Sequence, residues 1–111
     1  MFKLIRDNIP ELMSEQGMNL NYASAQNDDF FKSLLRGKLV EEVNEYLAFG
    51  DSLEELADIK TVIDYLIGDR KEEFDQIYEQ KRKLRGGFDK KYIGFWPDKA
   101  TNTNNQTEME V

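Results

Sequence analysis

Two stretches of the chain repeat their apolar residues at helical spacing, and a short break at Gly50-Asp51 separates them. They are LVEEVNEY (39–46) and LEELADIK (53–60). A break this short predicts that the two helices lie antiparallel as a hairpin. Each stretch also carries carboxylates among its apolar positions. Acidic groups therefore lie on helix faces that would otherwise form a core, and their presence there needs a physical explanation.

Helical spacing continues over most of the chain and predicts an all-α fold. We expect a short helix between Pro10 and Gly17, and three longer ones over about 28–49, 52–67 and 70–85. Proline suits the first turn of a helix and glycine its end. The predicted fold class is a helical bundle built from antiparallel helix hairpins and completed by oligomerisation.

Two capping signals mark the central helices. Asp28 or Asp29 is placed to cap the first of them. Ser52, with Glu55 three residues later, matches a capping box at the start of the second. A Glu55 side chain that closes this box cannot easily bind a metal at the same time, so the capping box is an alternative role for Glu55.

The C-terminal part combines an aromatic segment with a polar tail. FDKKYIGFW (88–96) is expected to pack back on the helices as an irregular segment or a short hairpin. From Pro97 onward the chain has almost no large apolar group, which predicts a disordered tail. The sequence thus predicts one domain over residues 1–96 and a tail over 97–111.

Composition excludes several kinds of chemistry. The 111 residues include no cysteine and no histidine, which excludes disulfides, thiolate zinc sites and the commonest general base. A bound metal must have oxygen ligands, which favours magnesium, manganese or calcium.

The net charge of −7 argues against broad nucleic-acid binding. Without a long apolar run or a signal peptide, we expect no membrane association and a cytoplasmic location.

Four carboxylates fall on core-facing positions of the two central helices. At about 100° per residue, Glu42 and Glu45 lie with the apolar residues of the first helix, and Glu41 lies on its flank. Glu55 and Asp58 lie with the apolar residues of the second. Across the hairpin turn, Glu45 faces Glu55. Glu42 faces Asp58 in a second layer roughly 4.5 Å away.

Unpaired charges at such positions require compensation. Either the pKa values of the carboxyl groups rise, or cations bind them. A divalent cation is the simplest solution, and it predicts a metal site in the hairpin. The alternative is a solvated acidic face, because surface helices are rich in glutamate.

The acidic pattern resembles that of a known superfamily. EExxE at 41–45 followed by ExxD at 55–58 is similar to the all-α nucleotide pyrophosphatases, which include MazG proteins, phosphoribosyl-ATP pyrophosphohydrolases and dimeric dUTPases. KLIRDNIPE (3–11) and KRKLRGGF (81–88) look like the ends of small single-domain members. The resemblance covers about residues 3–95. Only nine residues separate Glu45 from Glu55, fewer than in MazG proteins, so substrate choice has to come from outside this loop.

The resemblance implies Mg²⁺-dependent hydrolysis of a nucleoside triphosphate to a monophosphate and pyrophosphate, with Mn²⁺ as an alternative ion. It implies metal-ligand roles for Glu42, Glu45, Glu55 and Asp58. It also implies a homodimer or homotetramer, which the small size of the chain favours independently. In a chain without histidine, we expect Glu41 or Glu45 to act as the catalytic base for water.

Cations are needed for the remaining phosphate charge. The candidate substrate-binding residues are Lys38, Lys81, Arg82 and Arg85. Alternatively, Lys38 forms an ion pair with Glu42, and the other three complement a helix C-terminus. Lys3 and Arg6 are weaker candidates. Asp64 lies opposite the site and is expected to be solvated or paired.

Two other functions fit the same residues. Phosphoribosyl-ATP is an alternative substrate that leaves the chemistry unchanged. A helical binding module, whose acids hold a basic partner or a structural cation without catalysis, is the alternative of a different class.

Overall fold

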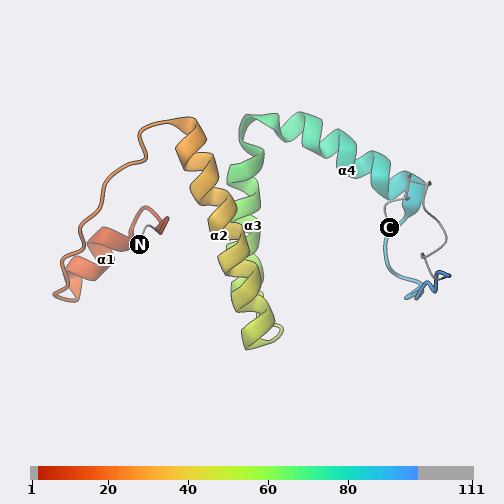
Figure 1. Ribbon diagram of the computed structural model, residues 1–111, viewed down its shortest axis with the longest axis horizontal. Helices are drawn as coiled ribbons and strands as arrows, with labels where there is room; N and C mark the ends of the chain where they lie inside the picture. Colours follow the sequence, from red (N-terminus) through yellow and green to blue (C-terminus); the bar gives the residue numbers. More distant parts are fainter. Residues whose placement is uncertain (1–2, 98–111) are drawn as a thin grey trace. The chain divides into compact units, whose positions relative to one another are not determined.

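Four α-helices and one 3₁₀ turn form the regular structure of residues 3–97, which the computed structural model describes (Figure 1). In chain order they are α1 (Ile9–Glu15), α2 (Asp28–Phe49), α3 (Leu53–Ile67), η1 (Gly68–Arg70) and α4 (Lys71–Arg85). This confirms the predicted all-α fold. The chain divides into two units, Met1–Gln76 and Ile77–Val111, and the boundary falls inside α4.

The start of α2 differs slightly from the prediction. Asn27 is the capping residue, because its side chain accepts a hydrogen bond of 2.8 Å from the Phe30 N–H while its backbone stays extended. Asp28 and Asp29 already lie in the first helical turn, where negative charge complements the helix dipole. The prediction that one of them caps the helix is therefore wrong by one or two residues.

The turn between α2 and α3 is tight and well bonded. Gly50 ends α2 with a φ of 84°, which an L side chain rarely adopts. Ser52 caps α3, since its Oγ accepts a 3.4 Å hydrogen bond from the Glu55 N–H. The Tyr46 hydroxyl donates to Asp51 Oδ1 at 2.9 Å, and this bond raises the pKa of Tyr46. The turn holds α2 and α3 side by side.

The two long helices pack antiparallel in the first unit (Figure 1). Their core is small: among the described residues, Leu35 of α2 and Val62 of α3 are the buried apolar side chains, at 5% and 7% exposure. Burying a side chain of this kind stabilises a fold by about 1.5–3 kcal/mol. Glu42 is as buried as these two, with a relative exposure of 6%. A carboxylate therefore lies at the level of the core in this hairpin.

The second unit consists of the end of α4 and the segment after it. Residues 88–96 form no helix or strand, and Phe88, Tyr92 and Phe95 are at least 83% exposed. The irregular character predicted for this segment is confirmed. Its packing on the helices of the first unit stays a prediction.

The predicted tail lies almost entirely outside the described residues, since 98–111 are not among them. Within residues 3–97, no helix has the length and apolar character needed to cross a membrane.

The C-terminal end of α3 is capped by a side chain. The Arg70 guanidinium donates a hydrogen bond of 2.7 Å to the Leu66 carbonyl, which would otherwise lack a partner in the helix. The 3₁₀ turn over Gly68–Arg70 separates α3 from α4, as the predicted helix ranges of about 52–67 and 70–85 require.

Candidate functional site

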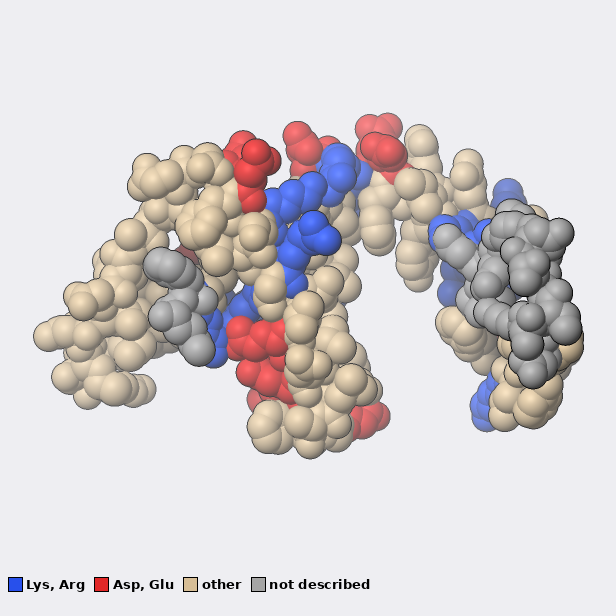
Figure 2. Space-filling model, in the orientation of Figure 1, with Lys and Arg blue, Asp and Glu red and all other residues tan. Residues whose placement is uncertain are grey.

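Helices α2 and α3 bring five carboxylates together as two overlapping groups. The first group contains Glu41, Glu42 and Glu45, and the second contains Glu42, Glu55 and Asp58. Within each group, one oxygen per residue lies within 4.8 Å of the others. Figure 2 shows acidic side chains gathered on the hairpin, beside a band of basic side chains. Glu42 and Asp58 lie together as predicted, but Glu55 joins these two and does not share a group with Glu45.

Two of these carboxylates have buried oxygens without a partner. Glu42 Oε2 and Glu55 Oε2 are inaccessible to solvent, and neither forms a hydrogen bond within the described part of the chain. A buried carboxylate oxygen without a donor costs free energy, because water no longer solvates it. Both oxygens belong to the group that also contains Asp58. A cation at this group would satisfy them.

The pKa values of the acids shift in opposite directions. Burial raises the pKa of Glu55, and the neighbouring Glu45, Glu42 and Asp58 raise it further. By contrast, the hydrogen bond from Lys3 lowers the pKa of Glu41. Within the cluster, the surroundings of Glu41 favour its charged form, whereas those of Glu55 disfavour it.

Lys38 lies between two of the acids. Its Nζ is 3.4 Å from Glu42 Oε1 and 3.5 Å from Glu41 Oε1, and its side chain is only 18% exposed. These distances match the alternative in which Lys38 pairs with Glu42. Its role in binding substrate stays a prediction.

The N-terminal segment supplies two more cations. Lys3 Nζ lies 2.8 Å from Glu41 Oε1. Arg6 Nη2 lies 2.6 Å from Asp58 Oδ1 and 3.4 Å from Thr61 Oγ1. From the sequence alone, Lys3 and Arg6 are the weaker candidates for binding phosphate. Their contacts with the acids cannot be predicted from residue spacing, because they precede α1 in a non-helical segment and the acids lie far along the chain.

Glu55 is not held by the capping box. The Ser52 N–H, which the Glu55 carboxylate would have to accept from, donates instead to the Gly50 carbonyl at 2.9 Å. Only the Ser52 half of the motif is formed, through the Glu55 N–H. The Glu55 side chain is therefore available to the acidic cluster.

The remaining predicted residues lie elsewhere. Lys81, Arg82 and Arg85 belong to the second unit, and their assignment to substrate stays a prediction. Asp64 pairs with Lys60 at 3.1 Å, which confirms that it has a partner outside the cluster.

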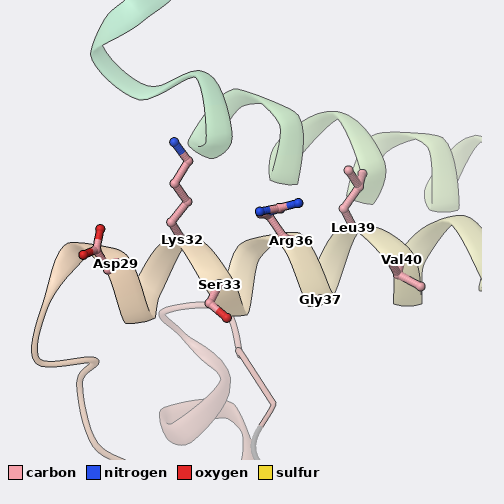
Figure 3. Close-up of a pocket in the computed structure, with 7 residues that line it drawn as sticks. All are labelled: Asp29, Lys32, Ser33, Arg36, Gly37, Leu39 and Val40. Atoms are coloured by element: carbon pink, nitrogen blue, oxygen red, sulfur yellow. The ribbon is translucent and has the colours of Figure 1, made fainter.

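A shallow hollow follows α2 alone. Figure 3 shows Lys32 and Arg36 extending from one side of the helix and Val40 from the other. None of the clustered acids lines this hollow. The candidate site is therefore the carboxylate cluster and not the hollow.

Comparisons with protein-family models, with curated proteins and with solved structures found no match for this chain. Every candidate ligand atom in the cluster is a carboxylate oxygen. Such a donor set suits Mg²⁺, Mn²⁺ or Ca²⁺ and disfavours metals that require nitrogen or sulfur.

Proposed function

We propose that the protein is a Mg²⁺-dependent nucleoside triphosphate pyrophosphohydrolase of the all-α nucleotide pyrophosphatase superfamily, with a house-cleaning role. Its products are a nucleoside monophosphate and pyrophosphate. The observation that carries the proposal is the pair of buried, unpartnered oxygens of Glu42 and Glu55 within a group of acids from two helices. A solvated acidic face would not bury these atoms.

The residues fit a divalent cation. Glu42, Glu55 and Asp58 would hold it. Glu45, which shares the other group with Glu42, is proposed as a further ligand, and Mn²⁺ is an alternative to Mg²⁺. When bound, the ion neutralises phosphate charge and lowers the pKa of a bound water. Such assistance is what hydrolysis of a phosphoric anhydride needs, since little covalent chemistry is required of the protein.

Of the two candidate bases, Glu45 is favoured over Glu41. The lowered pKa of Glu41, caused by Lys3, makes its carboxylate a weaker proton acceptor. Across residues 3–97, no ion pair holds the Glu45 carboxylate. Glu45 would accept a proton from the attacking water, and Glu41 would hold Lys3 and Lys38 beside the cluster in the free protein.

Oligomerisation is part of the proposal. Several large apolar side chains of the hairpin are exposed, among them Leu47 (71%), Phe49 (74%) and Leu53 (81%). A second copy would cover such groups, as in a homodimer or homotetramer. Light scattering at micromolar concentration tests this, and a monomeric mass would contradict it.

The deciding experiment measures pyrophosphate release from canonical and modified nucleoside triphosphates, with Mg²⁺ and with EDTA. We expect Mg²⁺-dependent turnover, and the preferred nucleotide identifies the substrate. Turnover of phosphoribosyl-ATP alone would favour the biosynthetic alternative. Absence of turnover on all of them, with Mn²⁺ bound in calorimetry, would favour the non-catalytic binding module.

A further inference from the structure

We infer that Arg6 and Lys3 form, with Lys38, a phosphate-binding site at the edge of the carboxylate cluster. In the free protein the two N-terminal cations pair with carboxylates, and on ligand binding they exchange these partners for the phosphates of the substrate. The inference rests on the proposed function and adds to it the residues that recognise the phosphates. Its test separates the two.

Some carboxylate oxygens of the cluster have a cationic partner and others have none. Arg6 holds Asp58 Oδ1 and Lys3 holds Glu41 Oε1, at 2.6 and 2.8 Å. The buried oxygens of Glu42 and Glu55 keep no partner. The chain thus neutralises the outer acids with its own cations and leaves the inner oxygens to a ligand from outside.

Both N-terminal cations are accessible to a ligand. The side chain of Arg6 is 57% exposed and that of Lys3 is 54% exposed, whereas Lys38 is 18% exposed. Both side-chain hydrogen bonds of Arg6, to Asp58 and Thr61, are donated by Nη2. A guanidinium has five N–H donors, so Nη1 and Nε remain for a phosphate, which they match in geometry.

Charge explains why the partners would exchange. A divalent cation beside Asp58 competes with Arg6 for the same carboxylate and repels the guanidinium. A polyphosphate that arrives with the ion offers a new acceptor within reach. Arg6 and Lys3 precede α1, which begins at Ile9, so they can shift without breaking a helix.

The exchange predicts opposite effects of one substitution. Arg6→Gln removes a competitor for Asp58, so Mn²⁺ alone should bind about three- to ten-fold more tightly in calorimetry. The same variant lacks a phosphate ligand, so its KM for the preferred nucleoside triphosphate should rise about ten-fold. A merely structural role would weaken both. Arg6→Lys should lie between Arg6→Gln and the wild type.

Lys60→Gln is the matched control, because it removes an exposed ion pair on α3 away from the cluster. It should leave both quantities unchanged. Unchanged or jointly weakened binding in Arg6→Gln, with an active wild type, overturns the inference and leaves the proposed function standing. A wild type without turnover overturns both. If Arg6→Gln loses helical content in circular dichroism, Lys3→Gln decides by the same two measurements.

Discussion

The α2–α3 hairpin and the segment after α4 depart from ordinary burial in opposite ways. The hairpin buries a carboxylate, with Glu42 at 6% exposure, whereas the segment exposes Phe95 at 88%. Each arrangement is unfavourable for an isolated chain, because charge prefers water and aromatic surface avoids it. A cation bound to the hairpin and an apolar partner on the segment would relieve these two costs. The comparison shows that a missing binding partner can be inferred from a buried charged group as well as from an exposed apolar one.

The strongest test of the hairpin is Glu42→Gln, which keeps the shape and removes the charge. Because Glu42 belongs to both acidic groups, turnover should fall by about 100-fold or more while the helical content persists. Asp64→Asn is the control, since Asp64 pairs with Lys60 outside the cluster. Retained turnover in Glu42→Gln would refute its assignment as a metal ligand.

Leu35→Ala measures what the apolar part of the hairpin contributes. Leu35 is 5% exposed and packs in the small core, so its truncation should lower the free energy of unfolding by about 2–4 kcal/mol. Urea denaturation followed by circular dichroism gives the value. A loss below about 1 kcal/mol would mean that this core contributes little to stability.

Glu55→Gln tests the polar side of the hairpin through pH. The raised pKa of Glu55 means that its stabilising contribution is complete below the unfolded-state pKa, near 4.5, and is lost as pH rises through the folded-state pKa. In EDTA, the variant should therefore gain stability over the wild type at pH 7 and not at pH 4. Denaturant midpoints at the two pH values check this. An equal gain at both would show that the charge of Glu55 is not the cause.

Phe95→Ser should have the smallest effect. The ring is 88% exposed in the single chain, so the free energy of unfolding should change by less than about 0.5 kcal/mol. Thermal denaturation at low protein concentration measures it. A larger loss that grows with protein concentration would show that a second copy covers the segment.

Helical periodicity was enough to predict the hairpin and the convergence of its acids. Those features depend on neighbours in sequence and on one tight turn, so Glu42 and Asp58 could be placed from spacing alone. The N-terminal cations could not be placed, because their contacts depend on the path of a non-helical segment. The predicted packing of the aromatic segment rests on its composition, which favours burial but does not identify the surface that would cover it.

The tight turn at Gly50 has a consequence for how the protein folds. All five clustered acids lie within residues 41–58, so the contacts between them are local in sequence. Local contacts close short loops and form early, before distant segments meet. The group of acids is thus assembled as soon as this one hairpin has formed. An ion that binds at this stage would act as a folding nucleus, and its concentration would set the folding rate as well as the stability of the product.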